Sequence, residues 1–494
     1  MIGRCLITGA LIAAACSMAS VPSFIPNSSS GQEQRTGGVT PSLALPPAPV
    51  QPPNVVPLST AEQLGKDIFF DKTLSNPIGL SCATCHLPSA GFTGESSAVN
   101  KAAGPMPGVV PGRFGHRKPQ AVPYATFSPY GPYYSGDLQV WLGGNFWDGR
   151  APDTVAQARM PFLDPDEMAN TPVGPYPPHS GGYSPLVAEK LRERPYAPLF
   201  VEVFGDGVFA SSDAEIYAMA TTAIAAYEAS AEVVQFSSKF DASSNGTPPM
   251  NKYKFNPSEA NGMALFFGKA QCFQCHSSAT LAPVLAITAG KDTFTMYCYA
   301  NIGVPKNPND PFYKETNSSS NPHGYNPLGA NFIDYGLGGN PNPSPSGMLF
   351  MNATPGDVAQ FRGLFKAPSV RNVDKRPTPG FVKAYMHNAV FKSLEEVVHF
   401  YNKRNIAVNH LGYEVAFDLR VGPPPGYARL LPPPEVIDNV QNVAGVSPDD
   451  ATAAVASNGQ VGNLGLTPRE EADLVDFLRT LTDGFTRPNP VGDE

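Results

Sequence analysis

The sequence is short of several features, and each shortage excludes a class of protein. Its 494 residues include 34 lysines and arginines against 42 aspartates and glutamates, which gives a formal net charge of −8. Because positive charge is neither in excess nor concentrated in one stretch, we expect no nucleic-acid partner. After residue 20, no segment has the length and apolarity of a transmembrane helix. The chain is long enough for two or three domains with cores of their own.

Cysteine and histidine are also scarce, with 7 and 8 copies, so the places where they cluster are informative. Four of the cysteines lie in two matching patterns, residues 82–86 (Cys-Ala-Thr-Cys-His) and residues 272–276 (Cys-Phe-Gln-Cys-His). This spacing is the attachment signal for c-type haem. The two thiols bond covalently to the porphyrin, and the adjacent His becomes an iron ligand. We therefore predict two covalently bound haem c groups.

The residues that this prediction assigns are Cys82 and Cys85 with the iron ligand His86, and Cys272 and Cys275 with the iron ligand His276. The alternative is a structural zinc site, which paired Cys-x-x-Cys motifs can also build. A His directly after the second Cys is not zinc spacing, and the two pairs lie far apart in the sequence, so haem is favoured. The remaining cysteines, Cys5, Cys16 and Cys298, leave the body of the protein without an internal disulfide.

The first 20 residues have the pattern of an export signal. A positive charge at Arg4 precedes an apolar stretch over residues 6–15, and small residues follow. Residues 13–17 also resemble a lipoprotein cleavage site, so lipid attachment at Cys16 and an ordinary signal-peptidase cut both stay open. We expect a periplasmic protein whose only membrane contact would be that lipid. Residues 21–57, rich in Pro and Ser, predict a tether.

The segments that precede the two motifs form an internal repeat. Ser59 is a candidate N-cap for a predicted helix over residues 61–70, and a similar arrangement begins at Asn256. A repeat of this kind indicates a duplicated cytochrome unit. We therefore predict a mainly α fold of two cytochrome c-like haem domains, residues 58–245 and 246–494. The 54 prolines and 46 glycines indicate extensive loops.

Two further helical patterns are expected to complete these domains. Residues 213–234 are Ala-rich and predict a long helix that closes the first domain. Thr467 and Glu470 form a capping box with Pro468 at the first helical position. The helix that follows carries a broad apolar face and is expected to end near Gly484.

Residues 145–151 (Asn-Phe-Trp-Asp-Gly-Arg-Ala) resemble a motif of the bacterial dihaem cytochrome c peroxidase family, which also includes the MauG type of maturation enzyme. The resemblance resumes at residues 365–373 (Phe-Lys-Ala-Pro-Ser-Val-Arg-Asn-Val) and continues through residues 385–388 and 394–401. Together with both haem motifs it covers most of residues 59–485. It is specific, because the separated motifs occur in the order typical of the family.

The resemblance implies different tasks for the two haems. The N-terminal haem, on His86, would be the peroxidatic one, and the C-terminal haem, on His276, would relay electrons. Trp147 would lie between them and pass electrons by stepwise oxidation of its indole. The alternative for Trp147 is an ordinary core residue.

Glu167 is the candidate distal acid–base catalyst by the same resemblance. Cleavage of peroxide needs a group that takes a proton from one oxygen and returns it to the departing oxygen, and a carboxylate in a dry pocket can do both. Gln157 and Pro161 resemble the distal-pocket residues and are expected to shape the site. Taken alone, a Glu beside Asp164 and Asp166 is more typical of a solvated acidic cluster.

The second iron is expected to have Tyr401 as its other axial ligand. At this place the peroxidases carry a Met and the MauG type carries a Tyr. A phenolate is a hard, anionic donor, so Tyr401 should lower the potential of this haem. A core Tyr on an amphipathic helix is the alternative, and His387 and His399 are rival donors.

The first iron is expected to be five-coordinate and open to peroxide. In the peroxidases, a His in the loop after the first motif blocks the iron until the protein is reduced. The only His of the corresponding loop here is His116, which does not match the place of that ligand, and Met106 is another donor to consider.

Calcium, common between the two haems of this family, is in doubt here. The family uses an Asn side chain and two backbone carbonyls, and the matching places are Arg117, Val382 and Ala384. Carbonyl ligands survive substitution, but an Arg in place of the Asn does not help a cation to bind.

Three functions follow from this resemblance. The first is a peroxidase that reduces hydrogen peroxide with electrons from a small cytochrome c or copper protein, passed from the C-terminal haem through Trp147 to the N-terminal haem. The second is a MauG-like enzyme that oxidises a protein or another large substrate through a high-valent dihaem state. The third is a non-catalytic electron carrier. Glu167 and the open first haem argue against the third.

Overall fold

The computed structural model describes residues 57–94, 96–138, 140–174, 182–244, 254–314, 326, 328–339, 360–440 and 461–485. The predicted export signal, Cys16 and all but the last residue of the predicted tether lie outside these ranges. Among the residues that the structure describes, no helix has the length and apolarity that crossing a membrane requires.

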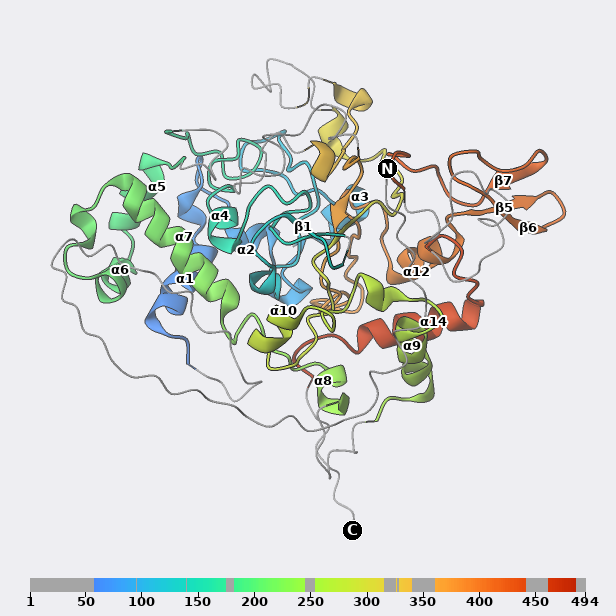
Figure 1. Ribbon diagram of the computed structural model, residues 1–494. Helices are drawn as coiled ribbons and strands as arrows, with labels where there is room; N and C mark the ends of the chain where they lie inside the picture. Colours follow the sequence, from blue (N-terminus) through green and yellow to red (C-terminus); the bar gives the residue numbers. More distant parts are fainter. Residues whose placement is uncertain are drawn as a thin grey trace, which may run out of the picture.

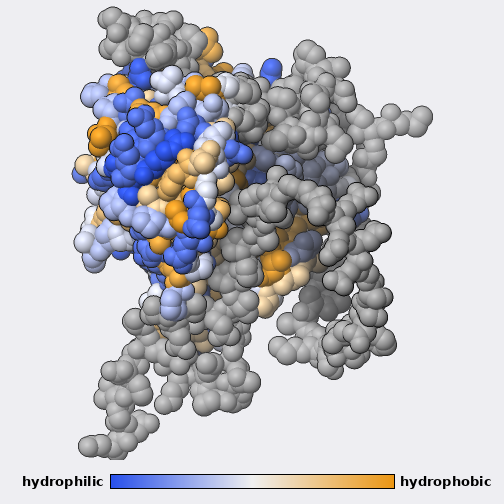
Figure 2. Space-filling model, turned by 90° about the vertical axis from the view of Figure 1, so that its left-hand side faces the viewer, coloured by the Kyte–Doolittle hydropathy of each residue, from blue (hydrophilic) through white to orange (hydrophobic). Residues whose placement is uncertain are grey.

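Short helices joined by loops make up the body of the molecule, in agreement with the mainly α prediction (Figure 1). The α-helices are α1 (Thr60–Phe70), α2 (Cys82–Cys85), α3 (Ser97–Ala102), α4 (Thr154–Ala158), α5 (Pro185–Arg192), α6 (Ala197–Phe204), α7 (Asp213–Ala229), α8 (Lys239–Ser244), α9 (Pro257–Phe267), α10 (Ala282–Ile287), α12 (Leu394–Lys403) and α14 (Pro468–Arg479). Figure 2 shows the side on which α5 and α6 lie, where hydrophilic residues cover most of the coloured surface.

The strands are short and form three small antiparallel sheets. They are β1 (Tyr133–Ser135), β2 (Val140–Leu142), β3 (Tyr299–Ala300), β4 (Phe365–Lys366), β5 (Ile406–Asn409), β6 (Glu414–Ala416) and β7 (Tyr427–Arg429). β1 pairs with β2, β3 pairs with β4, and the third sheet has the order β6-β5-β7. This last sheet projects from the body beside α12 (Figure 1).

Four helices form two equivalent pairs, α1 with α7 and α9 with α14. Each of the four begins with a capping box, in which an N-cap side chain and a Glu three residues later satisfy each other's backbone N–H groups. The N-caps are Ser59, Ser212, Asn256 and Thr467. The helix starts predicted at Ser59, Asn256 and Thr467 are therefore confirmed.

Each pair crosses at a glycine, and the two crossings are alike. A Cβ on Gly65 of α1 would lie 1.8 Å from the carbonyl oxygen of Ala223 on α7. A Cβ on Gly262 of α9 would lie 1.9 Å from the carbonyl oxygen of Asp473 on α14. Since no side chain fits at such a distance, glycine permits the close approach of each helix pair. The repeat seen in the sequence thus has a structural counterpart.

The long helix predicted over residues 213–234 is shorter in the structure. It ends at Ala229, because Ser230 takes extended backbone angles. Val233 and Val234 then turn into the core, where they are 2% and 1% exposed. Burial of this β-branched pair outweighs continuation of the helix.

Two main hydrophobic cores follow the two helix pairs. The first surrounds α1 and α7, and the second surrounds α9 and α14. The second half of the chain also reaches into the first core, through Leu281, Val284, Tyr297 and Cys298. The predicted domain boundary at residue 245 falls outside the described residues and stays a prediction.

Candidate functional site

The first of two large cavities surrounds the N-terminal Cys-x-x-Cys-His motif. Cys82, Cys85 and His86, on and just after α2, line a space of about 1350 Å³, its open mouth included. The five cysteines that the structure describes form no disulfide.

The His86 ring is held in the form that binds a metal. Its Nδ1 lies 3.1 Å from the carbonyl oxygen of Phe92. Burial lowers the pKa of His86, which favours the neutral ring. A neutral imidazole that donates its Nδ1–H to a carbonyl presents Nε2 as the ligand atom.

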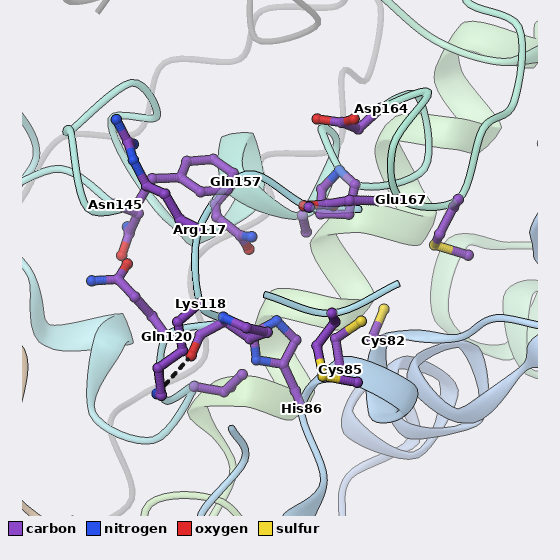
Figure 3. Close-up of a pocket in the computed structure, with 18 of the residues that line it drawn as sticks. Cys82, Cys85, His86, Arg117, Lys118, Gln120, Asn145, Gln157, Asp164 and Glu167 are labelled. Carbon is purple, nitrogen blue, oxygen red and sulfur yellow. Dashed lines mark hydrogen bonds between the residues drawn. The ribbon is translucent and has the colours of Figure 1, made fainter. Parts of the chain in front are cut away.

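Glu167 and Gln157 lie across this cavity from the motif (Figure 3), and Pro161 also lines the cavity. Gln157 belongs to α4, and the other two follow on the loop after it. The backbone of Glu167 is fixed at both ends, because its N–H donates to Asp164 O (3.1 Å) and its carbonyl accepts from Val109 N–H (2.8 Å). The structure therefore brings together the three distal residues that the sequence predicted for this wall.

The carboxyls of this wall influence one another, and Asp166 is buried whereas Asp164 and Glu167 are half-buried. Burial, followed by the negative charge of Asp164, raises the pKa of Glu167 to about 8, and Arg150 opposes the shift. Burial and Asp164 likewise raise the pKa of Asp166 to about 7. Asp166 is 2% exposed. A solvated acidic cluster, the alternative raised by the sequence, does not describe this arrangement.

Arg117 carries a buried positive charge at the place expected for calcium. Its guanidinium contacts Asp148 at 2.7 Å and makes two further 2.7 Å contacts with Asp334. The carbonyl of Val382, one of the two expected backbone ligands, accepts a 3.0 Å hydrogen bond from the Asn100 amide. No group of three or more His, Cys, Asp or Glu in the described ranges could hold a metal ion. The residues at this place are therefore not suited to bind calcium.

His116 and Met106 both line the first cavity. The His116 ring stacks on Phe312 with centroids 4.8 Å apart, and its Nε2 lies 3.9 Å from an Asp334 oxygen. Burial and the neighbouring Arg117 lower the pKa of His116 to about 3. The open first iron stays a prediction.

The second cavity surrounds the C-terminal motif and measures about 1560 Å³. Cys272, Cys275 and His276 line it, and His276 Nδ1 lies 3.0 Å from the carbonyl oxygen of Pro368. Burial lowers the pKa of His276 to about 4. The orientation of this ring therefore repeats that of His86. Most of the other lining side chains are apolar, among them Leu474 of α14.

Tyr401 of α12 lines the second cavity with a hydroxyl that makes no hydrogen bond in the described part of the chain. The buried tyrosines nearby behave differently: Tyr297 donates to Tyr124 O (2.8 Å), and Tyr299 donates to Gly143 O (2.7 Å). Tyr401 is half-buried, and its hydroxyl is available to a ligand in the cavity. Burial raises the pKa of Tyr401 above its ordinary value.

The structure separates the two rival donors. His387 lines the second cavity and is buried, and its ring stacks on Phe365 with centroids 3.6 Å apart. Burial lowers the pKa of His387 to about 3. His399 instead contacts Glu471 at 3.2 Å, has a side chain that is 45% exposed, and does not line the cavity.

Trp147 lines both cavities and is 8% exposed. Its Nε1–H donates to Lys118 O (2.8 Å), and its own carbonyl accepts from Lys366 N–H (2.9 Å). The indole is thus fixed in the wall between the two motifs. This position agrees with the expectation for Trp147, although position alone does not establish electron transfer.

Sequence reasoning missed three buried ionisable residues of these cavities. Lys118 lines the first cavity and Lys366 the second, and burial lowers the pKa of each to about 7. Glu228 of α7 also lines the first cavity, and burial raises its pKa to about 8. Isolated residues on a loop, a short strand and an Ala-rich helix carry no local signal of such positions.

The donor chemistry of both cavities fits haem c. Each supplies two thiols at the required spacing and one His whose Nδ1 is held by a carbonyl. The first adds a carboxyl across from the His, and the second adds an unpartnered phenol.

Comparison with known proteins gives a consistent result. The sequence model of the family described as "Di-haem cytochrome c peroxidase" matches residues 59–248. The methylamine utilization protein MauG of Paracoccus denitrificans is 33% identical over 341 residues, which are 69% of this chain and 73% of the relative. Cytochrome-c peroxidase IdrP1 of a Pseudomonas species is 29% identical over 376 residues, which are 74% of this chain and 77% of the relative.

A solved structure is similar over most of its length. The crystal structure of the diheme peroxidase BthA from Burkholderia thailandensis matches with a TM-score of 0.58 and 27% identity, and the match covers 87% of each chain.

Proposed function

Because the chain belongs to the family of di-haem cytochrome c peroxidases and MauG proteins, we propose that it reduces hydrogen peroxide in the first cavity. It is an oxidoreductase of the dihaem type. In the proposal, a small cytochrome c or copper protein supplies electrons at the second cavity. The two haem domains would be residues 58–245 and 246–494, each holding one haem c by the thiols of its motif.

One observation carries this proposal: Glu167 lies across the first cavity from His86 (Figure 3). A peroxide molecule held between them would have a proton acceptor on one side and the cofactor on the other. A carrier of electrons needs no carboxyl at that place. Since a carboxyl whose pKa is raised to about 8 is typical of functional sites, Glu167 calls for a functional explanation.

When bound, haem supplies the redox chemistry: it takes up electrons and promotes cleavage of the O–O bond. Glu167 takes a proton from one peroxide oxygen and returns it to the other, which leaves as water. With two electrons and two further protons, one peroxide yields two water molecules. The pKa of about 8 keeps both forms of Glu167 accessible near neutral pH.

The other distal residues position the reactants in this proposal. The Gln157 amide can donate a hydrogen bond to the peroxide and so turn its proton toward Glu167. Pro161 restricts the cavity next to Glu167 and has no N–H that would hold competing water. Electrons would cross between the cavities at the Trp147 indole, which lines both.

A second candidate function is oxidation of a protein or other large substrate, as the MauG type performs. The unpartnered Tyr401 hydroxyl favours it, because phenolate ligation at the second iron would lower the potential there. A ligand of the second iron does not by itself identify a substrate.

Steady turnover separates these candidates. The purified dihaem protein would be mixed with hydrogen peroxide and excess reduced cytochrome c or reduced copper protein. We expect many equivalents of peroxide to be consumed per protein molecule. Oxidation of the protein by peroxide without sustained consumption would favour the second candidate. No reaction with peroxide at all would overturn both and leave an electron carrier.

We also propose that residues 1–20 direct export to the periplasm. Covalent attachment of haem c is the feature that supports this location. The mass of the mature chain shows which cleavage takes place. A chain that is cut before Cys16 and carries a lipid has a different mass from a chain that is cut after residue 17. A mature protein that keeps residues 1–20 would contradict export.

A further inference from the structure

The internal repeat allows the two cavities to be compared residue by residue. At the first crossing, the residues nearest to Gly65 are Ala223 and Tyr227 of α7. At the second crossing, the residues nearest to Gly262 are Asp473 and Phe477 of α14. Ala223 is therefore equivalent to Asp473, and Tyr227 is equivalent to Phe477.

Glu228 follows Tyr227 on α7, and Leu478 follows Phe477 on α14. Glu228 and Leu478 are therefore equivalent. The register is supported one turn earlier, where Ile224 and Leu474 are equivalent and each lines its own cavity. Glu228 and Leu478 also line their cavities. At one wall position, the first cavity thus has a carboxyl where the second has a leucine.

Glu228 is buried without a partner. It is 6% exposed, and its carboxyl makes no hydrogen bond or ion pair in the described ranges. A buried carboxyl that lacks a partner is costly to keep, whereas a leucine at this position would contribute to the core. Its retention on the wall of a cofactor cavity points to a role toward the cofactor.

The charged groups around Glu228 do not neutralise it. On α1, Lys66 pairs with Glu232 (2.7 Å), and Asp67 accepts from Gln63 (2.9 Å). On α7 itself, Tyr227 donates to Glu232 (3.2 Å). α4 has no titratable side chain. The other titratable side chains facing this cavity are Cys82, Cys85, His86, His116, Arg117, Lys118, Arg150, Asp164, Asp166 and Glu167.

Burial alone accounts for the shift of Glu228. It raises the pKa of Glu228 to about 8, with no charged neighbour contributing. The charge of Glu228 also acts on the neighbouring motif: burial, followed by this charge, raises the pKa of the Cys82 thiol to about 12. Glu228 is therefore electrostatically coupled to the motif that would attach the first haem.

We propose that Glu228 is the proton acceptor linked to reduction of the first haem. When one electron from a reductant enters this cavity, the carboxylate of Glu228 takes one proton from solvent, and oxidation releases that proton again. No covalent bond other than O–H is made or broken. In a buried cavity, an added electron repels the carboxylate charge, so reduction favours the protonated form. The inference rests on the proposed haem in the first cavity but not on peroxide chemistry.

The test is a redox titration of the holoprotein from pH 5.5 to 9.5, with each haem followed by its own spectrum. In the wild type, the potential of the first haem should fall with pH by up to about 59 mV for each tenfold change in proton concentration. Glu228→Gln keeps the size of the side chain and should remove this slope. Glu228→Leu installs the residue of the second cavity and should do the same. The pH dependence of the second haem should not change in either variant.

Two controls make the result decisive. Haem content by pyridine haemochrome shows that both haems are attached in each variant, so a folding failure is recognised. Glu167 lines the same cavity and is the competing carboxyl, so Glu167→Gln should reduce the pH slope of the first haem less than Glu228→Gln does. An unchanged slope in Glu228→Gln, or a greater loss of slope in Glu167→Gln than in Glu228→Gln, would overturn the proposal. Neither outcome depends on peroxide turnover, so failure here and failure of the proposed function are distinguishable.

Discussion

The two cavities share a framework and differ in a few wall positions. Each is closed by a helix pair that crosses at a glycine, and each holds one motif His through a backbone carbonyl. The first adds the carboxyls Glu167 and Glu228, and the second adds apolar side chains and Tyr401. The repeat therefore accounts for the common place of the two motifs, while a few side chains make the two walls chemically different.

Loss of the distal carboxyl should produce the largest effect on this comparison. Glu167→Gln keeps the shape of the side chain but cannot accept a proton. General acid–base catalysis contributes on the order of 10²–10⁴-fold, so the rate of reaction with peroxide should fall by that factor. Stopped-flow absorbance measures the rate, and both haems should remain attached. Glu189→Gln, which changes an exposed carboxylate of α5, is the control and should react like the wild type.

Trp147 connects the two cavities, so its replacement should slow the transfer of electrons between them. Trp147→Phe removes the indole and its hydrogen bond to Lys118 O. We expect electron exchange between the haems to slow at least tenfold, measured by rapid-mixing spectroscopy. Trp141→Phe is the matched control, because Trp141 packs on Phe361 and lines neither cavity. Equal rates in the two variants would contradict the role of Trp147.

The pH dependence of the peroxide reaction should follow Glu167. Its carboxylate is the active form, and with a pKa of about 8 this form becomes more abundant as pH rises. The rate should therefore rise about tenfold per pH unit below pH 8 and level off above it. In Glu167→Gln the residual rate should be flat over this range. A wild-type rate that falls as pH rises would reverse the assigned role.

The smallest effects should distinguish Tyr401 from Tyr299. Tyr299→Phe loses a buried hydrogen bond and should lower the free energy of unfolding by about 1 kcal/mol, without altering either haem spectrum. Tyr401→Phe loses no hydrogen bond within the described residues, so the prediction for this variant concerns the second haem. Its effect should instead appear as an altered spectrum and a higher potential of the second haem. An unchanged second haem would show that Tyr401 is not a ligand.

The sequence predicted the parts of this arrangement that depend on local pattern. The Cys-x-x-Cys-His motifs, the helix starts at Ser59, Asn256 and Thr467, and the helical repeat are all encoded within short segments. The distal wall was predicted through resemblance, and the structure brings Glu167 and Gln157 to the same cavity as His86. The roles of these residues stay predictions.

What the sequence could not predict depends on contacts between distant segments. Arg117 pairs with Asp334, whose loop lies far along the chain, so the ion pair that holds this guanidinium at the expected calcium place could be seen only in the fold. The inward direction of Glu228 follows from the crossing of α7 with α1 at Gly65. The early end of α7 at Ala229 reflects burial of Val233 and Val234, which the Ala-rich pattern does not reveal.

The division of labour between the cavities is tested most directly by counting the cyanide that the oxidised dihaem protein binds. The account predicts one cyanide per molecule, bound in the first cavity, and loss of the reaction with peroxide when it is bound. The second cavity should stay closed to cyanide if Tyr401 is the ligand of its iron. Binding of two cyanides, binding of none, or one cyanide that leaves the peroxide reaction intact would contradict the account.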